Sequence, residues 1–209
     1  MFDIGDIVQY LGKFARVNSQ SILKSIKEPF LEPIVRRFRF EKALSLIANG
    51  SIVVDIGCGH TPNLLNRLRT HIKEGIGIDP LIKSQNYKNI KLISKMLGDK
   101  IPIKDNYADY VTLLAVLEHL ENPSRLLKEA YRLLKPGGKL ILTTPTPWNK
   151  PVLEFLSFRL GWISSREIAE HKTYFWEKDL VSYLQAAGFT KIKHSYFELR
   201  LNNFLVAEK

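Results

Sequence analysis

The chain of 209 residues is 45% hydrophobic, an ordinary content for a protein with a buried core. No apolar run approaches the ~20 residues that span a membrane, and the first residues lack the basic region and apolar stretch of a signal peptide. We therefore expect a cytoplasmic protein. A lone cysteine, Cys58, excludes an intramolecular disulfide and a multi-cysteine zinc site, and its place between two glycines favours a packing role.

The formal net charge of +10 raises the question of an anionic partner. Basic residues are spread along the chain, and the densest group contains only one acidic residue, Asp99. We interpret this group as a solvated edge, with an anionic substrate or a membrane surface as the alternative partner. Its members are Lys83, Lys88, Lys91, Lys95, Lys100 and Lys104.

Residues 1–40 open the chain with apolar side chains at helical spacing, including Ile4, Val8 and Leu11. We predict an N-terminal helical extension over this range. From residue 41 onward, apolar strand patterns alternate with helical patterns, which is typical of a parallel sheet covered on both faces. The sequence therefore predicts one α/β domain over residues 41–209 with the extension added before it.

The first predicted strand, residues 51–55, ends in Asp55 and is followed by Gly57 and Gly59. Glycine tolerates positive φ and has no Cβ, so the backbone can turn sharply and a ligand can approach it closely. In a dinucleotide-binding turn a third glycine helps the next helix to receive a pyrophosphate, but here that position is Pro62. The acid ahead of the glycines and this proline favour a cationic ligand without phosphate.

The next predicted helix covers residues 62–70, with Thr61 as its N-cap and Pro62 as its first residue. A second strand over residues 74–78 then ends in Asp79, 20 residues beyond Gly59 (79 − 59). An acid at this position in nucleoside-binding α/β folds accepts hydrogen bonds from ribose hydroxyls. Asp79 is therefore the single residue that we assign most firmly to ligand binding.

The rest of the chain continues the alternation, except that the helix expected between residues 80 and 88 is hardly visible. Residues 145–173 interrupt the pattern and are rich in aromatic side chains. The chain ends in two strands close enough to form an antiparallel hairpin. The predicted strands are residues 89–94, 108–114, 139–143, 191–197 and 204–208, and the predicted helices are residues 123–134 and 177–187.

These motifs together resemble the class I S-adenosylmethionine-dependent methyltransferases, whose first motif runs Asp-x-Gly-x-Gly-x-Gly. Asp55, Gly57 and Gly59 match it, whereas the last glycine is Thr61. The segments around Leu117-Glu118-His119-Leu120 and Leu134-Lys135-Pro136-Gly137-Gly138 resemble later family motifs. The closest wording is that of a broad subgroup that includes quinone-biosynthetic enzymes. The resemblance implies a seven-stranded, doubly wound Rossmann-like sheet whose last strand is antiparallel, with a helical, aromatic lid at residues 145–175.

The resemblance also implies that S-adenosylmethionine is the methyl donor. Asp55 would face its ammonium group and Asp79 its ribose. On the adenine side, relatives carry an acid where this chain has Leu97, so either Asp99 or the backbone of Met96 and Leu97 takes that role. The implied donor site comprises Asp55, Gly57, Cys58, Gly59, Asp79, Pro80, Met96, Leu97, Asp99 and Ala115.

The acceptor side is less defined by sequence. His119 is the first candidate base because it follows a strand end, and His171 and Tyr174 are further candidates. The segment Ala115-Val116-Leu117-Glu118-His119 lacks the Asn-Pro-Pro-Tyr of DNA amino-methylating enzymes, so DNA is an unlikely acceptor. No grouping typical of metal-dependent transfer is visible, and we predict no metal requirement.

We therefore expect methyl transfer to a small-molecule, lipid-linked or sugar-type acceptor, at an oxygen atom. The aromatic lid and the extension would form the acceptor pocket, although such residues also suit a lid core or a dimer interface. Contact with a membrane surface, and a monomer or a homodimer, stay open. The alternative function is a non-catalytic S-adenosylmethionine-binding regulator or scaffold with a basic surface for RNA or membrane.

Overall fold

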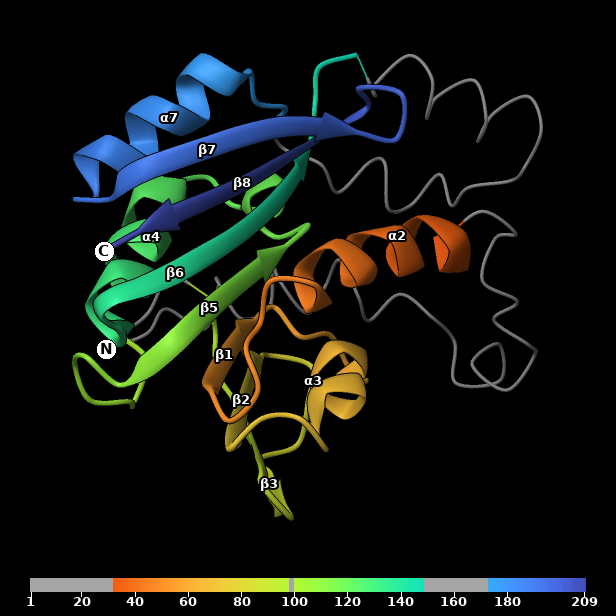
Figure 1. Ribbon diagram of the computed structural model, residues 1–209, viewed down its shortest axis with the longest axis vertical. Coiled ribbons are helices and arrows are strands. Elements are labelled where there is room, and N and C mark those ends of the chain that lie inside the picture. The colour runs from red at the N-terminus through yellow and green to blue at the C-terminus, as the bar shows by residue number, and fades with distance from the viewer. Residues whose placement is uncertain (1–31, 98–99, 149–172) are drawn as a thin grey trace, which may run out of the picture.

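The computed structural model describes residues 32–97, 100–148 and 173–209, and the described part is built on one twisted sheet (Figure 1). The sheet has eight strands within these ranges, in the order β3-β4-β2-β1-β5-β6-β8-β7. Their bounds are β1 Ile52–Ile56, β2 Glu74–Asp79, β3 Gln85–Tyr87, β4 Ile90–Ser94, β5 Ala108–Leu114, β6 Leu134–Pro145, β7 Thr190–Phe197 and β8 Asn202–Glu208.

The strand directions confirm the predicted topology. β4, β2, β1, β5 and β6 run parallel, and β8 pairs antiparallel with both β6 and β7. The carboxyl ends of the parallel strands therefore meet at one edge of the sheet. Because β8 is reversed, its first residues and the end of β7 lie at this same edge, which is where open α/β sheets bind their ligands.

The strand β3 is the eighth strand, which the seven-stranded expectation did not include. It pairs antiparallel with β4 at the edge of the sheet, and its three residues are exposed. It occupies the segment between Pro80 and Lys88 where a second helix was hardly visible in the sequence. Polar residues that face solvent on both sides give neither a helical nor a strand periodicity, so the sequence pattern could not indicate this strand.

Helices cover both faces of the sheet: α2 (Glu32–Leu44) and α3 (Asn63–Leu68) on one, α4 (Pro123–Leu133) and α7 (Glu177–Ala186) on the other (Figure 1). Successive strand residues point to opposite faces. Val54 therefore packs in the core under α4 and α7, whereas its neighbour Val53 packs in the core under α2 and α3. The alternating apolar residues of the strands thus build two cores.

The start of α3 differs from the prediction by one residue. α3 begins at Asn63, and Pro62 is the N-cap with no side-chain cap hydrogen bond. Thr61 contributes instead through its backbone, since its carbonyl oxygen accepts a hydrogen bond from the Asn63 N–H at 2.7 Å. The prediction that Thr61 caps with its side chain was therefore wrong, because the turn from Gly57 onward is one residue longer than expected.

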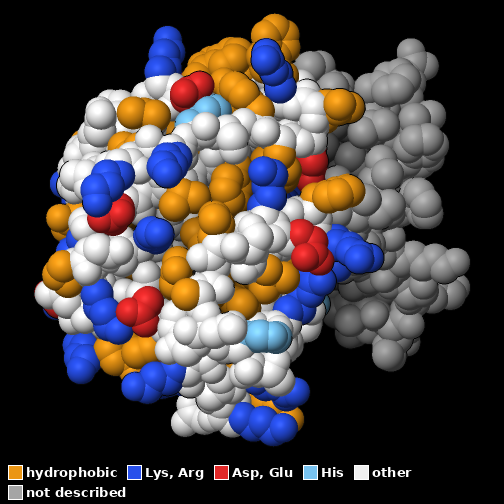
Figure 2. Space-filling view, in the orientation of Figure 1, with side chains coloured by type: hydrophobic (Ala, Val, Ile, Leu, Met, Phe, Trp, Pro, Cys, Tyr) orange, Lys and Arg blue, Asp and Glu red, His pale blue; other side chains and the backbone are white. Residues whose placement is uncertain are grey.

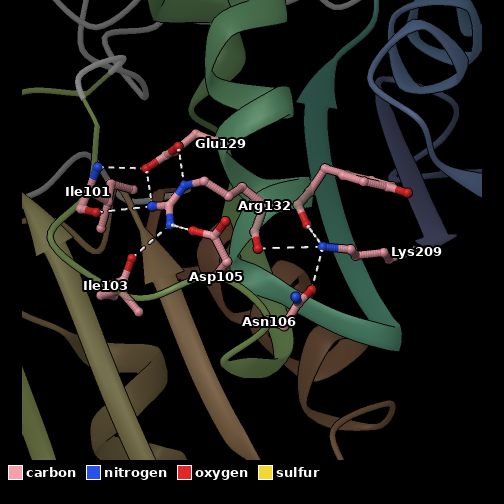
Figure 3. Close-up of polar contacts among 8 residues, drawn as sticks. Ile101, Ile103, Asp105, Asn106, Glu129, Arg132 and Lys209 are labelled. Atoms are coloured by element: carbon pink, nitrogen blue, oxygen red, sulfur yellow. Dashed lines mark hydrogen bonds and ion pairs between the residues drawn. The ribbon is translucent and has the colours of Figure 1, made fainter.

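A polar network ties the loop before β5 to α4 (Figure 3). The Arg132 guanidinium donates to both carboxylate oxygens of Glu129, to the Asp105 carboxylate, and to the carbonyl oxygens of Ile101 and Ile103. Glu129 also accepts from the Ile101 N–H at 2.6 Å. A planar guanidinium with several fixed N–H donors suits this set of oxygens, so Arg132 holds the loop that follows β4 against α4.

We expect Arg132→Lys to lower the free energy of unfolding by about 2–3 kcal/mol, because a lysine cannot reach two carboxylates and two carbonyls at once. Urea unfolding followed by circular dichroism measures this change. Arg125→Lys, at an exposed position of the same helix, is the matched control and should be neutral. Equal stability of the two variants would show that the network contributes little.

The charged surface is consistent with a dispersed excess of basic residues. Figure 2 shows Lys and Arg side chains scattered over the visible face, with apolar and acidic side chains between them. Five lysines of the sequence group are exposed and Lys95 is half-buried. In the part of the chain that the structure describes, no helix is both long and apolar enough to cross a membrane.

Most of the predicted extension and lid, residues 1–31 and 149–172, lie outside the described residues. α2 runs across residue 40, the expected end of the extension. The described ends of the lid segment, Thr146 and residues 173–176, lie at the carboxyl edge of the sheet: the Thr146 N–H donates to the Leu201 carbonyl at 2.9 Å and the Thr173 N–H to the Glu118 carbonyl at 3.2 Å. The segment therefore leaves and re-enters the fold at the ligand-binding edge.

Candidate functional site

The turn after β1 has the backbone geometry that its glycines suggest. Gly57 and Gly59 have φ of +78° and +72°, in the left-handed region that favours glycine. The N–H groups of Gly57 and Cys58 both donate to the Ile78 carbonyl oxygen, at 2.7 and 3.3 Å. These bonds fold the turn against the end of β2.

The two glycines have different surroundings. A Cβ added at Gly57 would lie 2.4 Å from Cγ2 of Val116, a buried residue after β5. A Cβ added at Gly59 would meet nothing within 4 Å. Gly57 is therefore needed for packing inside the protein, whereas the space beside Gly59 is open for a ligand to approach the backbone.

Asp55 is buried at the end of β1, with 4% of its surface exposed. Its Oδ1 accepts a hydrogen bond from the Thr112 hydroxyl at 2.5 Å, across the β1–β5 register that pairs the two residues. Burial raises the pKa of Asp55 from 3.8 to about 6; the Thr112 hydrogen bond opposes the rise and the nearby charge of Asp79 adds to it. A buried carboxylate of this kind gains from an opposite charge in a ligand.

Asp79, at the end of β2, holds the turn in place. Its Oδ2 accepts from the Gly59 N–H at 2.9 Å and its Oδ1 from the Leu81 N–H at 2.8 Å, and the residue is buried. A carboxylate has about four acceptor sites, so two remain for hydroxyl groups of a ligand. The predicted ribose acid thus lies directly beside the predicted glycine turn, with the half-buried Pro80 next to it.

The Cys58 thiol packs inside this turn. Its Sγ lies 2.9 Å from the position of a Cβ added at Gly77, in the neighbouring strand. Burial raises the pKa of the thiol strongly, and the negative charges of Asp55 and Asp79 add to this effect. A thiol held in its protonated form is a poor nucleophile, which agrees with the packing role expected from the sequence.

The predicted adenine-side residues follow β4. Met96 is exposed and Leu97 is half-buried against the core under α4 and α7. Asp99 lies outside the described residues, so the choice between its side chain and the backbone of Met96 and Leu97 stays a prediction.

The segment after β5 packs against the glycine turn. Ala115 has a φ of +59°, unusual for a residue with a Cβ, and its N–H donates to both the carbonyl and the hydroxyl oxygen of Thr143, at 3.0 and 3.1 Å. This constrained backbone brings Val116 against Gly57 and leads into the short 3₁₀ helix η1 (Leu117–His119). Strained backbone of this kind persists where surrounding contacts hold it, often at functional sites.

The acceptor-side candidates are only partly described. His119 ends η1 and Tyr174 lies in the described end of the predicted lid, and both are half-buried at the carboxyl edge of the sheet. His171 lies outside the described residues. Within those residues, no group of three or more His, Cys, Asp or Glu side chains is placed to hold a metal ion.

Two residues at this edge were not assigned a role from the sequence. Thr112 bonds to Asp55, and their pairing could have been inferred only from the register of β1 and β5. Glu118 is 1% exposed although it is charged. The sequence signal for Glu118 was its place next to His119 in the segment after a predicted strand.

A mostly parallel sheet with a reversed strand, an acid-and-glycine turn after one strand and a buried acid after the next define a nucleoside-binding α/β domain. The sequence profile of a family described as a methyltransferase domain matches residues 28–194, and the chain belongs to this family. The family implies a methyl acceptor that is a small molecule or a macromolecule.

Individual relatives and solved structures agree with this assignment. The chain is 27% identical to the mitochondrial ubiquinone biosynthesis O-methyltransferase of Rattus norvegicus, over 80% of this chain and 50% of that protein. It is 30% identical to a ubiquinone/menaquinone biosynthesis C-methyltransferase of Xylella fastidiosa, over 45% of this chain and 43% of that protein. A SAM-dependent methyltransferase structure from Archaeoglobus fulgidus has a TM-score of 0.64 at 18% identity, covering 84% of this chain and 94% of that one.

The chain spans about half the length of the curated relatives that it matches. S-adenosylmethionine is the donor of this family, and the residues present fit it. The open space beside Gly59 admits a ligand to the backbone, Asp79 keeps free acceptor sites for hydroxyls, and the buried Asp55 suits an ammonium group.

Proposed function

We propose that this chain transfers a methyl group from S-adenosylmethionine to a small-molecule, lipid-linked or sugar-type acceptor at oxygen. The observation that carries the proposal is the Asp79 carboxylate, which bonds the Gly59 N–H and lies beside the open face of the turn. The bound donor supplies a methyl group on a positively charged sulfur. The protein then has to hold the donor, align the acceptor and exclude water.

On the donor side, Asp55 would face the ammonium group, Asp79 would accept from the ribose hydroxyls, and Gly59 would let the backbone approach. Cys58 and Pro80 would shape the turn, and Met96 and Leu97 would lie on the adenine side. Ala115 would close the donor site on the side of β5. The positions of the described residues along the carboxyl edges of β1, β2, β4 and β5 support this arrangement.

On the acceptor side, His119 and Tyr174 lie at the same edge of the sheet, and they support placing the acceptor beside the end of β5. A protonatable group there would receive the proton of a hydroxyl acceptor. One relative carries the name of an O-methyltransferase and another that of a C-methyltransferase. Oxygen is proposed here because His119, whose side chain can take the proton of a hydroxyl, follows the end of β5.

We expect Asp79→Ala to weaken S-adenosylmethionine binding at least 10-fold. The ribose hydroxyls of the donor would lose two hydrogen bonds to a charged carboxylate, worth about 1.5–3 kcal/mol each. Isothermal titration calorimetry measures the affinity. Asp109→Ala is the matched control, because Asp109 also accepts from a backbone N–H, that of Ile52 at 2.7 Å, but at the opposite end of the sheet. It should leave donor binding unchanged.

Absence of donor binding by the wild-type protein would contradict the proposed function outright. Donor binding followed by release of S-adenosylhomocysteine with at least one acceptor would separate an enzyme from a non-catalytic binder. Equal loss of binding in the two aspartate variants would mean that the effect comes from the fold and not from the donor site.

A further inference from the structure

Four buried side-chain polar atoms have no hydrogen-bond partner among the described residues. They are Nε of Arg39, Oε2 of Glu118, Oγ1 of Thr144 and Oε1 of Glu198. Buried polar atoms in folded proteins are nearly always paired, so each exception calls for a physical reason. Glu118 and Thr144 are almost completely buried, at 1% and 0% exposure.

The charged members of this set influence one another electrostatically. Burial raises the pKa of Glu118 and of Glu198, and the positive charge of Arg39 opposes the rise in both. The Thr144 hydroxyl lies close enough to lower the pKa of Glu118, yet its Oγ1 completes no hydrogen bond of good geometry. Among the described residues Arg39 forms no ion pair with either carboxylate, so its charge acts on both of them without direct contact. We call Arg39, Glu118, Thr144 and Glu198 the polar niche.

Four different elements hold the niche at the carboxyl edge of the sheet. Glu118 is in η1, Thr144 is the second-to-last residue of β6, and Glu198 directly follows β7. Arg39 lies one turn before Lys42 on α2, whose Nζ sits over the rings of Phe197 and Phe204 at 5.6 and 4.9 Å. This contact fixes α2 against β7 and β8 and so fixes the position of Arg39.

The niche is next to the donor turn. Val116, which fills the space against Gly57, is two residues before Glu118. The Glu118 carbonyl accepts from the Thr173 N–H, where the chain returns from the lid segment. A group in the niche would therefore lie between the donor side and the end of the predicted lid.

The unpaired atoms define the chemistry of the missing partner. The two carboxylate oxygens require hydrogen-bond donors, and the Arg39 Nε–H requires an acceptor. An ammonium group donates but cannot accept, and an anion would meet two carboxylates against one guanidinium. A hydroxyl group donates one hydrogen bond and can accept others, so a single hydroxyl can pair with both Oε2 of Glu118 and the Arg39 Nε–H. Oε1 of Glu198 then needs a donor of its own.

We propose that the polar niche binds the hydroxyl group of the methyl acceptor and that Glu118 takes its proton. This inference rests on the proposed function. The oxygen–hydrogen bond of the acceptor breaks and its proton goes to Oε2 of Glu118. A bond forms between that oxygen and the methyl carbon, while the carbon–sulfur bond breaks and leaves its electron pair on the sulfur. Arg39 and Thr144 orient the hydroxyl. His119 acts through Glu118, because its positive form stabilises the carboxylate.

Stability measurements test the niche without an acceptor. Removing unpaired buried groups should not harm the unliganded fold, so Glu118→Gln and Thr144→Val should keep or raise the Tm. Thr143→Val is the matched control, since Thr143 is equally buried but its hydroxyl accepts from the Ala115 N–H. We expect it to lower the Tm by about 2–4 °C. A loss in Thr144→Val equal to that in Thr143→Val would overturn the niche.

Transfer measurements test the chemistry, using phenols, alcohols and sugars beside their amino counterparts as acceptors. Glu118→Gln should lower kcat about 100-fold or more with an unchanged donor Kd, and His119→Gln should lower it less. Unchanged kcat in Glu118→Gln, or transfer to amines alone, overturns the inference. Wild-type protein that fails to bind the donor instead overturns the proposed function. If no acceptor reacts, the Tm comparison of Thr144→Val with Thr143→Val decides whether the niche stands.

Discussion

Gly57→Ala is expected to destabilise the fold by about 2–5 kcal/mol. The new Cβ would lie 2.4 Å from Cγ2 of Val116, which is 3% exposed and packs in the core under α4 and α7. Valine is stiff at χ1, so it cannot rotate away cheaply, and overpacking of this kind costs about 1–3 kcal/mol. The φ of +78° adds about 1–2 kcal/mol, because a residue with a Cβ rarely adopts it.

Gly59→Ala should behave differently although its φ is similar. Its Cβ would meet nothing within 4 Å, so only the backbone penalty of about 1–2 kcal/mol applies to the unliganded fold. The same Cβ would occupy the open space where we place the donor. We therefore expect Gly59→Ala to remain folded and to bind S-adenosylmethionine at least 10-fold more weakly.

Gly50→Ala separates backbone strain from packing and from binding. Gly50 has a φ of +75° and nothing within 4 Å of its added Cβ, and it lies before β1, away from the turn. Urea unfolding and calorimetric titration of the three alanine variants give the comparison. Adding Val116→Ala to Gly57→Ala should restore part of the lost stability. Equal destabilisation at all three glycines would contradict the packing argument.

The fold was predictable because strand ends and their acids follow a simple pattern. Apolar runs that end in Asp55 and Asp79 gave β1 and β2 to within one residue, and the apolar run over β5 was matched in full. The exposed strand β3, the start of α3 and the first five residues of β6, which begins at Leu134 and not at 139, escaped prediction. All three depend on pairing with distant segments or on the length of a turn, which local periodicity does not encode.

The candidate site was predictable where the spacing along the chain relates the two partners, and unpredictable where the partners lie far apart in the sequence. The glycine turn and the acid 20 residues beyond Gly59 predict a shared site, and the Gly59 N–H contacts Asp79 Oδ2 at 2.9 Å. The Thr112 hydroxyl reaches Asp55 from 57 residues away in the chain. The charge of Arg39 acts on Glu118 only because α2 packs on β7 and β8. Glu118 is unusual because it is buried. Its burial results from the fold, and the residues next to it in the sequence do not indicate it.

Asp55→Asn is expected to stabilise the unliganded protein at neutral pH while weakening donor binding. The folded-state pKa of about 6 lies above the ordinary value of 3.8, chiefly through burial. Between these two values the folded protein keeps a proton that the unfolded chain has released, so stability falls as the pH rises through this window. Above it, the loss amounts to roughly 3 kcal/mol, at about 1.4 kcal/mol for each pH unit of the difference.

An amide at position 55 does not ionise and can still accept from the Thr112 hydroxyl. Urea unfolding at pH 4 and pH 7.5 should therefore show little difference from wild type at the lower pH and a gain of roughly 1–3 kcal/mol at the higher. Asp109→Asn is a control of opposite sign. Partial burial acts to raise the pKa of Asp109, but Lys135 and the Ile52 N–H hold it below its ordinary value, so this variant should lose stability at neutral pH.

Donor binding should change in the other direction from stability. Wild-type affinity should rise with pH through about 6, because the ionised Asp55 carboxylate attracts the ammonium group of the donor. The Asn variant should bind at least 10-fold more weakly at pH 7.5 and show a flatter pH dependence. A less stable Asp55→Asn at pH 7.5 would mean that the carboxylate supports the fold itself. Greater stability with weaker binding would instead show that the buried charge is kept for the ligand at the expense of the fold.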